Sequence, residues 1–498
     1  MLRFWRNPLL ILYVRSELRP ARAGMAAAIS LIVCILIAMG CWSGNPGNAQ
    51  AFWATFYGWL LGAQFALLGF WSAGTCGHAV ARERELKTFD FLKTTRLTSA
   101  EIMVGKLLGA PIVAYFIIAC TLPISILAGF LGGFSPVAIL GSIVLLIAFN
   151  LFYSLAALLG STLVEKSNSG AIGLLGLLAN LLCMGFAESP IKGFAMISVL
   201  PAIFSQYRVD VDWGRVAPTV FGRVVPCLAL TLVLYVLLGA WIVLMIVRNL
   251  KRDIPQIQLL SRWQCVAFVA FWNLLFYVFL DTKEIRRPRS FAAYDISSFA
   301  AAWNALFLFL VGIAALGPHE KLKVWWRKWK AREASYFASD GLPWPWLVPA
   351  AAIGYVMLAV EALVLREGIP LSEWRLGSTA IVFGAFLVFT ARDILFLQWC
   401  LLTRMKQPVM KGVLFLMLYN ATAGILGALV STFAAPATSR VLTLLIPYAL
   451  LGEIEKLDVP LTFILAAAIL QTGICVLLLL AIQRRLARPV HIPVAEAA

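Results

Sequence analysis

The feature that most constrains this chain is a series of long apolar stretches, each able to cross a lipid bilayer. A bilayer core about 30 Å thick needs about 20 apolar helical residues. Of the 498 residues, 61% are hydrophobic and 13% are charged, whereas soluble globular proteins are about 25% charged. We therefore expect an all-α, polytopic helical membrane protein with about 12 transmembrane helices. The predicted spans are 23–40, 52–76, 107–130, 137–164, 170–187, 225–247, 263–280, 299–316, 345–365, 377–391, 412–432 and 460–482.

Several protein classes are excluded by the segments between these stretches. They are too short to hold a soluble catalytic domain of about 100 residues. The nine cysteines are dispersed and show no C-x-x-C spacing, so neither a zinc cluster nor a disulfide framework is indicated. The opening residues also lack the anatomy of a cleavable signal peptide.

The distribution of Lys and Arg predicts the topology. Alternate connecting segments hold 29 of the 41 basic residues and account for the whole net charge of +17. Positively charged loops stay in the cytoplasm, so we expect both termini to be cytoplasmic and the protein to lie in the cell (cytoplasmic or inner) membrane. Because topology explains the positive charge, no nucleic-acid partner is expected. The basic segments are 1–22, 77–106, 163–169, 248–262, 317–344, 392–411 and 483–498.

Two segments fit this topology less well. Segment 281–298 carries four basic residues, yet alternation places it outside. Segment 440–452 is too short to span the bilayer comfortably, so we interpret it as an outer re-entrant or interfacial helix. If it crossed, the carboxyl end would move outside, against the positive charge of Arg484, Arg485 and Arg488.

The N-terminal arm, residues 1–22, has a helix start at Asn7 and Pro8, a capping residue followed by proline in the first turn. Apolar residues then fall on one side, and basic residues follow toward the first span. This pattern predicts an amphipathic helix that lies in the cytoplasmic membrane interface. The alternative is a basic flank that only fixes orientation.

A second basic arm covers residues 319–337. Leu322 shares a helical face with three tryptophans, and five basic residues surround that face. Indole rings favour the headgroup level of a bilayer, so we expect an interfacial helix. Basic residues interleaved with aromatic ones could also stack on nucleic acid, but the spans on both sides favour the membrane. The expected membrane-interface residues are Trp325, Trp326 and Trp329.

The loop at 78–106 is dense in both signs of charge. It opens with four alternating charges, Arg82, Glu83, Arg84 and Glu85, and continues with a weak apolar edge, Leu86, Phe89 and Leu92. Thr98 and Glu101 then form a capping box, which starts a helix that we expect to run into the next span through Gly105 and Lys106. Such a projection would suit docking of a cytoplasmic partner. The alternative is a solvated loop held by its own salt bridges.

The pattern E-R-E … F-L-x-T-T … L-T … E-I-x-x-G-K in this loop resembles the cytoplasmic loop of type-2 ABC (ABC-2) exporter permeases. In that family the loop contains the coupling helix, which sits in a groove of the ATPase subunit. The segment from Asn7 to Arg19 is likewise similar to the family's elbow helix. The resemblance covers about the first 250 residues. The matching loop positions are Glu83, Glu85, Phe91, Leu92, Thr94, Leu97, Glu101, Ile102, Gly105 and Lys106.

Two departures from the family pattern affect the expected shape of the coupling helix. Family members commonly have Gly-Thr where this chain has Lys87-Thr88, and Thr-Pro where it has Thr95-Arg96. The resemblance nevertheless implies an ATPase-coupling surface. Its residues would be Arg82, Glu83, Arg84, Glu85, Phe89, Phe91, Leu92, Thr94, Glu101 and Lys106.

The resemblance implies that residues 1–250 form a six-span permease unit of an ATP-driven exporter, coupled to a separate cytoplasmic ABC ATPase subunit. Residues 251–498 form a second membrane half of about six spans. Its basic arm, its loop 391–412 and its segment 440–452 echo the order of the first half, although two spans are missing. If this half is a diverged repeat, one chain supplies both transmembrane halves; otherwise a homodimer is expected. The sequence does not indicate the substrate.

Sites for chemistry are mostly absent from the sequence. Gly105-Lys106 is followed by Leu107 and lacks the earlier glycine of a phosphate loop. We therefore expect a transport subunit without catalytic residues, with no cofactor or metal bound by this chain and with ATP-Mg on the partner subunit. The three histidines, which are widely separated in sequence, do not form a metal-ligand pattern; they are His78, His319 and His491.

Polar residues inside the spans are the remaining candidates. Glu361 is the only acid that we place deep in an apolar run, which favours a functional role by default, although its position also allows it to reach water. Gln64 and five asparagines either line a translocation path or make interhelical hydrogen bonds. The asparagines are Asn150, Asn180, Asn273, Asn304 and Asn420.

Two other functions are weighed against the permease. An ion- or proton-coupled secondary transporter would need buried ionisable residues near the midplane of the membrane and broken helices, and Glu361 alone comes near. A membrane-embedded lipid-modifying enzyme would need a cluster of His, Asp or Glu at an interface, which the sequence does not show.

Overall fold

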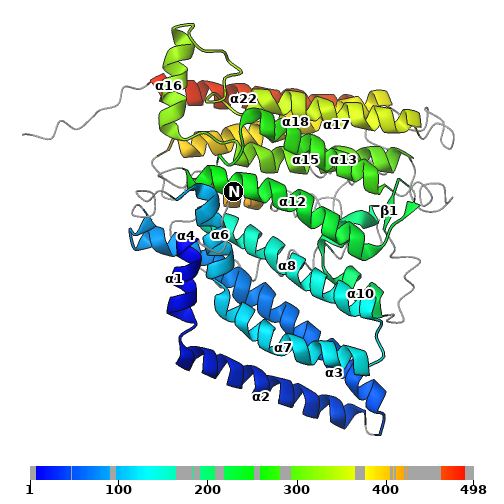
Figure 1. Ribbon diagram of the computed structural model, residues 1–498. Coiled ribbons are helices and arrows are strands. Elements are labelled where there is room, and N and C mark those ends of the chain that lie inside the picture. Colours follow the sequence, from blue (N-terminus) through cyan, green and yellow to red (C-terminus); the bar gives the residue numbers. More distant parts are fainter. Residues whose placement is uncertain are drawn as a thin grey trace, which may run out of the picture. The chain divides into compact units, whose positions relative to one another are not determined.

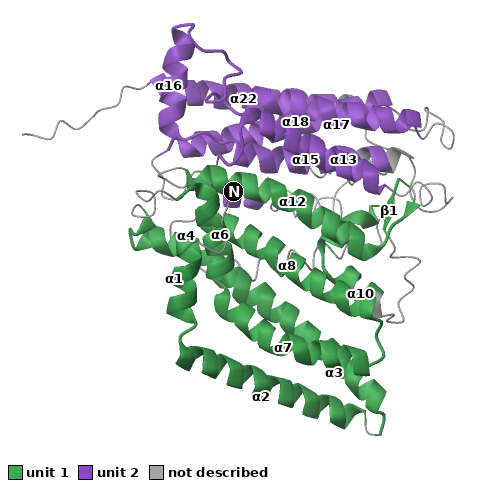
Figure 2. Ribbon diagram, viewed as in Figure 1, with its two compact units in different colours: residues 1–256 green, residues 257–498 purple. Residues whose placement is uncertain are grey.

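The computed structural model consists of helices apart from one short hairpin in its described part. The chain divides into two compact units, residues 1–256 and 257–498 (Figure 2). The structure describes residues 7–45, 47–89, 97–163, 183, 191–207, 218–221, 223–251, 258–280, 293–364, 376–403, 408, 411–419, 422 and 461–487.

Unit 1 begins with two helices, α1 (Pro8–Glu17) and α2 (Pro20–Gly44), and Figure 1 shows α1 running across the long axes of the helices beside it. A proline fits the first turn of a helix but disfavours helical backbone in the residue before it, so Pro20 separates the two. The other helical elements of unit 1 are α3 (Ala49–Leu67), the π-helical turn η2 (Leu68–Ser72), α4 (Ala73–Glu85), α6 (Ser99–Gly109), α7 (Ile112–Leu131), α8 (Pro136–Leu163), the 3-10 turn η4 (Lys192–Ile197), α10 (Leu200–Tyr207) and α12 (Cys227–Leu250).

The hairpin of unit 1 pairs β1 (Thr219–Val220) with β2 (Arg223–Val224) in antiparallel register. The core closest to the charged loop gathers residues from α1, α4, α6, α8 and α12. Its most buried members include Leu9, Cys76, Val80, Phe89, Ile102, Leu158 and Ile246.

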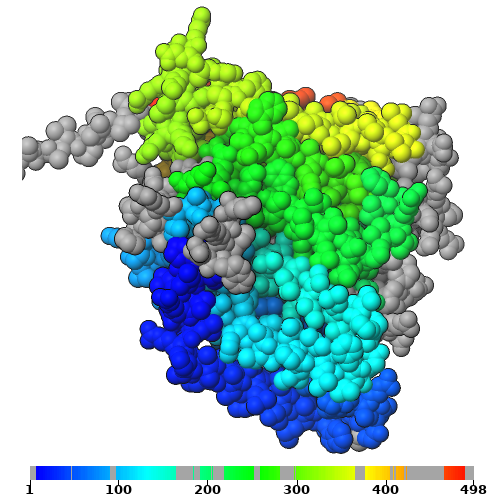
Figure 3. Space-filling view, in the orientation of Figure 1, coloured from blue at the N-terminus to red at the C-terminus, as the bar shows by residue number. Residues whose placement is uncertain are grey.

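Unit 2 is also a helical bundle. Its labelled helices are α13 (Arg262–Phe279), α15 (Ala293–Ala314), α16 (His319–Lys330), α17 (Trp344–Val364), α18 (Leu376–Leu401) and α22 (Leu461–Ala487). The chain bends by 92° between α15 and α16. As a result α16 stands out from unit 2 in the space-filling view (Figure 3).

Within the described ranges, nine helices are long and apolar enough to cross a membrane, or ten if α15 and α16 form one bent span. Their outward faces are apolar: in α2, Met25 is 60% exposed, Ile29 59%, Leu36 61% and Met39 65%. So much exposed apolar surface is stable in lipid rather than in water. The chain is thus a membrane-embedded, multi-span helical protein.

Two sequence-based expectations in unit 1 are corrected. The span predicted at 52–76 is longer than expected and continues without a break from Ala49 to Glu85. The helix expected to run from Thr98 into the span 107–130 instead ends at Gly109, and α7 begins after Pro111. Proline has no N–H to give to the carbonyl four residues earlier, and the Leu107 carbonyl accepts a bond of 3.1 Å from the Tyr115 hydroxyl instead.

In unit 2 the correction concerns α18. The predicted span 377–391 and the predicted cytoplasmic loop that follows it are one helix as far as Leu401. The residues after the expected end are helical because most of them are buried against neighbouring helices, among them Ile394, Leu395 and Leu397. Arg392 and Asp393 therefore lie inside a helix that is long enough to span the membrane.

Helices α18 and α22 run in the same direction. The Cys475 thiol donates to the Val388 carbonyl (3.7 Å), and further along both helices Arg485 donates to the Leu402 carbonyl (3.3 Å). Their carboxyl ends therefore lie at the same end of unit 2. The predicted spans 170–187 and 412–432 fall largely, and the segment 440–452 wholly, outside the described residues.

Candidate functional site at the corner of α1, α4 and α6

The charged end of α4 closes with a Schellman motif. The Thr88 N–H donates to the Glu83 carbonyl (2.8 Å) and the Lys87 N–H donates to the Arg84 carbonyl (3.0 Å). Lys87 has a φ of 57°, in the left-handed region that favours glycine. A non-glycine residue in this conformation costs roughly 1–2 kcal/mol.

A buried ion pair joins α6 to α4. The Lys106 side chain is 0% exposed, and its ammonium lies 2.5 Å from the Glu83 Oε1 and 3.1 Å from the Ala79 carbonyl, to which it donates. Burial lowers the pKa of Lys106, and the neighbouring Glu83 carboxylate opposes this by raising it. Because a buried ammonium without a partner is destabilised by several kcal/mol, the pair fixes where α6 meets α4.

Arg84 joins α4 to the end of α8. Its guanidinium donates to the Thr162 carbonyl at 2.6 Å and lies 5.1 Å from the centre of the Phe89 ring. Asn249 of α12 donates to the same Thr162 carbonyl (3.1 Å) and to the Thr162 hydroxyl (3.0 Å). The ends of α4, α8 and α12 therefore meet at one residue.

The four charges at the end of α4 thus divide into two pairs. Glu83 and Arg84 are partly buried and hold neighbouring helices, whereas Arg82 and Glu85 are exposed. Of the four, Arg82 and Glu85 are the best placed to meet a partner. Three further predicted coupling residues lie outside the described residues: Phe91, Leu92 and Thr94.

The predicted capping box at the start of α6 is confirmed. The Glu101 carboxylate accepts from the Thr98 N–H (2.8 Å) and from its hydroxyl (2.9 Å), and the Glu101 N–H donates to the Thr98 hydroxyl (3.2 Å). The bond from the Thr98 backbone lowers the pKa of Glu101, with help from the hydroxyl. Glu101 therefore has a structural duty at this helix start.

The predicted helix start at Asn7 and Pro8 is also confirmed. The Asn7 side chain accepts from the Leu9 N–H (3.0 Å) and donates to the Glu101 carbonyl (2.7 Å). One buried side chain thereby caps α1 and ties it to α6. In the space-filling view α1 (dark blue) lies on the surface of unit 1 (Figure 3).

Two glycines let α1 approach α6 closely. A Cβ added at Gly105 would lie 2.8 Å from the Cβ of Leu9, and one at Gly109 would lie 2.5 Å from Cδ2 of Tyr13. Small residues four apart allow such close helix packing in membrane proteins. This Gly-x-x-x-Gly pair was a signal in the sequence that our interpretation did not use for packing.

The basic arm of unit 2 packs one of its faces against the protein itself. Leu322, Trp325 and Trp326 of α16 are buried against α18 and α22, and Trp329 is partly buried at the same cluster. The aromatic face therefore meets the protein's own helices, because the carboxyl ends of α18 and α22 offer it an apolar surface. The basic side chains on the other face are mostly exposed; the exposed ones include Lys321, Arg327, Lys328 and Lys330.

The polar residues proposed for a translocation path largely bond between helices. Gln64 of α3 is buried, and its amide donates to Thr121 (3.0 Å) and Ser125 (2.8 Å) of α7. The described asparagines among the candidates also bond between helices: Asn150 donates to the Tyr115 hydroxyl (3.1 Å), and Asn273 donates to the Asn304 side chain (2.9 Å). This geometry favours the interhelical interpretation. Asn180 and Asn420 lie outside the described residues.

Our interpretation missed a buried charge pair in α18. The Arg392 guanidinium donates to the Asp393 carboxylate (2.6 and 2.8 Å) and to the Gln471 side chain of α22 (2.8 Å). All three residues are buried, with exposures of 6% for Arg392, 2% for Asp393 and 0% for Gln471. Glu361, by contrast, is half-buried and near the end of α17. The renewed apolar run after Asp393 was the signal that could have located this pair in a helix.

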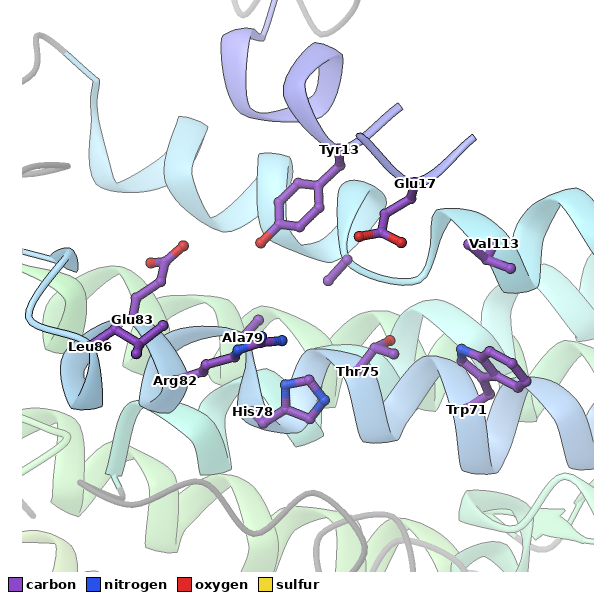
Figure 4. Close-up of a pocket in the computed structure, with 11 residues that line it drawn as sticks. Tyr13, Glu17, Trp71, Thr75, His78, Ala79, Arg82, Glu83, Leu86 and Val113 are labelled. Atoms are coloured by element: carbon purple, nitrogen blue, oxygen red, sulfur yellow. The ribbon is translucent and has the colours of Figure 1, made fainter. Parts of the chain in front are cut away.

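A pocket of about 420 Å³ opens between α1 and α4 beside this corner (Figure 4). Tyr13 and Glu17 point into it from α1, and His78 and Arg82 line the opposite wall. Burial raises the pKa of Tyr13 to about 12, and the neighbouring carboxylate of Glu83 adds to this. The phenol is therefore a neutral hydrogen-bond donor at physiological pH.

Among the described residues, no group of three or more His, Cys, Asp or Glu side chains gathers as a metal site. Comparison with protein-family models, with curated proteins and with solved structures finds no match for this chain. Its function therefore has to be argued from its own residues.

Proposed function

We propose that the chain is the membrane-spanning permease subunit of an ATP-driven, type-2 ABC exporter that works with a separate cytoplasmic ATPase subunit. The observation that carries the proposal is the corner at the end of α4. Its exposed charges, Arg82 and Glu85, are backed by the buried pair of Lys106 and Glu83. A surface that receives force needs such a rigid support, which an ordinary solvated loop does not have.

In this proposal the corner transmits force from the ATPase subunit to the transmembrane helices. A force on the exposed end of α4 passes to α6 through Lys106 and to α8 through the bond from Arg84 to Thr162. Helix α4 continues into the span that begins at Ala49, so the same force rocks that span. The π-helical turn η2 lies within it, and such turns occur often at functional sites.

In the proposed topology the protein crosses the cell membrane about 12 times. Both termini lie in the cytoplasm. The exposed basic residues of α16 and the arginines at the end of α22 lie at one end of unit 2, which the positive-inside rule assigns to the cytoplasm. Helices α1 and α16 are the proposed elbow helices. Units 1 and 2 either form the two transmembrane halves or belong to a homodimer, and ATP-Mg binds to the partner.

The test is purification of the full chain from native membranes in mild detergent, with identification of co-eluting proteins and an ATPase assay. We expect a stoichiometric ATPase that is lost in E85K, which reverses the charge of an exposed acid at the end of α4. The matched control is E320K, the same reversal at an exposed acid of α16. Absence of an ATPase under several lipid conditions, or its equal retention by both variants, would overturn the proposal.

A second candidate is an ion- or proton-coupled secondary transporter. The observation in its favour is the pair Arg392 and Asp393, because charges buried in membrane spans commonly mark ion pathways. In that case Asp393→Asn abolishes gradient-driven transport into vesicles without any requirement for ATP. Glu320→Gln, which alters an exposed acid of α16 in the same unit, is the matched control.

A further inference from the structure

The pocket between α1 and α4 has the form of an amphipathic groove (Figure 4). Its α4 wall carries side chains three or four residues apart, which spans roughly 16 Å along a helix. Its other wall comes from α1 and from the start of α7. Trp71 and Val113 lie toward one end, inside candidate membrane spans, and the charged residues line the rest. The residues of the first wall are Trp71 of η2 and Thr75, His78 and Arg82 of α4.

Two groups of the groove have polar atoms without a partner among the described residues. The Arg82 guanidinium lines the groove and makes no hydrogen bond or ion pair with another described residue, and the His78 imidazole lines the same wall. Oxygen Oε1 of Glu83 is bound by Lys106, but its second oxygen, Oε2, is buried without a hydrogen-bond partner. Buried polar atoms are rarely left unsatisfied, so the groove is matched to a ligand that has both an anionic group and an N–H donor.

We propose that this groove binds the headgroup of an aminophospholipid of the phosphatidylethanolamine type. Its phosphate meets Arg82 and His78, because guanidinium and imidazole groups donate well to phosphate oxygens. Its primary ammonium meets Glu17, replacing the exposed ion pair of 3.0 Å that Glu17 makes with Arg22, and the second oxygen of Glu83, with the Tyr13 hydroxyl close by. Its acyl chains leave along Trp71 and Val113 into the bilayer.

The chemistry of the groove separates this lipid from its relatives. A choline headgroup has no N–H and would leave the buried oxygen of Glu83 unsatisfied. A phosphatidylglycerol headgroup offers only neutral hydroxyls to Glu17 and Glu83, and these bond to carboxylates more weakly than an ammonium does. The bound lipid would bridge α1 and α4. The proposal does not depend on an ATPase partner, because lipid binding can be measured on this chain alone.

The test is native mass spectrometry of the full chain after delipidation, with phosphatidylethanolamine, phosphatidylcholine and phosphatidylglycerol added at equal concentrations. We expect phosphatidylethanolamine to be retained about tenfold better than the other two, a difference of about 1.4 kcal/mol. Equal retention of all three lipids would overturn the proposal. Displacement of the lipid by millimolar inorganic phosphate would also overturn it, since the site would then be one for a free anion.

Two variants test which side chains bind the ammonium and the phosphate of the headgroup. Glu17→Gln is expected to remove the preference for phosphatidylethanolamine over phosphatidylcholine, and Arg82→Ala to weaken both about tenfold. Glu320→Gln, an exposed acid of α16, is the matched control and leaves retention unchanged. An unchanged thermal unfolding profile shows that each variant is folded. Retention that is unaffected in both Glu17→Gln and Arg82→Ala would contradict the assignment.

Discussion

Each of the two units contains a fully buried cation that closes a corner between helices. In unit 1, Lys106 is bound by the Glu83 carboxylate and by the Ala79 carbonyl. In unit 2, Arg262 at the start of α13 donates to the carbonyls of Ser339 (3.1 Å), Gly341 (2.6 Å) and Ala315. The last of these lies at the bend between α15 and α16.

The difference between the two corners lies in the groups that oppose the charge. Glu83 is an acid whose side chain is 23% exposed and borders a pocket, so a ligand, a partner or a proton can reach it. Arg262 is held by backbone carbonyls, which do not titrate. Unit 1 therefore has a corner that can respond to a ligand, a partner or a proton, whereas the corner of unit 2 is a fixed scaffold.

The largest expected effect on stability comes from removing the buried cation of the fixed corner in unit 2. Arg262→Met leaves the buried carbonyls of Ala315 and Gly341 without this donor, and each orphaned group costs about 1–3 kcal/mol. We expect a loss of about 4 kcal/mol in the free energy of unfolding of unit 2, measured by denaturant titration in detergent. Hydrogen exchange should rise at the bend between α15 and α16 but not in unit 1. Wild-type stability of this variant would mean that the corner is held by other contacts.

The next effect concerns the responsive corner. Glu83→Gln leaves the Lys106 ammonium buried without its counter-charge, and we expect a loss of about 3 kcal/mol in unit 1. In the double variant E83Q/K106M the buried charge is gone, so most of the stability should return. Strictly additive losses in the same denaturant titration would show that the two side chains do not act as a pair.

A third, smaller effect concerns the helix ends beside the two corners, which have the same turn. Helix α16 ends in the same Schellman motif as α4, with Arg332 at a φ of 60° where α4 has Lys87. Lys87→Gly and Arg332→Gly should each relieve left-handed strain and raise stability by about 1 kcal/mol. Thermal unfolding in detergent measures the gain. Lys87→Ala keeps the strain and should give none, so an equal gain from alanine would exclude this explanation.

The smallest effect is a dependence on pH at the start of α6. Hydrogen bonds from Thr98 hold the pKa of Glu101 below its ordinary value of 4.5. The capping box is therefore fully stabilising above pH 4.5 and weakens as the pH falls through the lowered pKa. Hydrogen exchange at the first turn of α6 should rise in that acidic range. Glu101→Gln should remove this dependence, and a persistent one would assign it to another group.

The two helix starts were predicted correctly from the sequence because helix capping depends only on residues close together in the chain. The caps at Asn7 and at Thr98 with Glu101 form among residues at most three apart, and the structure contains both. The break at Pro111 was missed although its cause is equally local, because the apolar run continues across it. The end of α18 was misplaced because adjacent opposite charges resemble the end of a span, whereas Arg392 and Asp393 neutralise each other within the helix.

By itself the sequence determined that the chain is a helical membrane protein and where several of its helices begin, since apolar length and capping depend on neighbouring residues alone. Only the tertiary structure decided which charges are buried. Glu83 and Arg84 differ from Arg82 and Glu85 because their partners lie far along the chain, as in the bond from Arg84 to Thr162, 78 residues away. The burial of a charge depends on the partners that folding brings to it, and no local pattern records them.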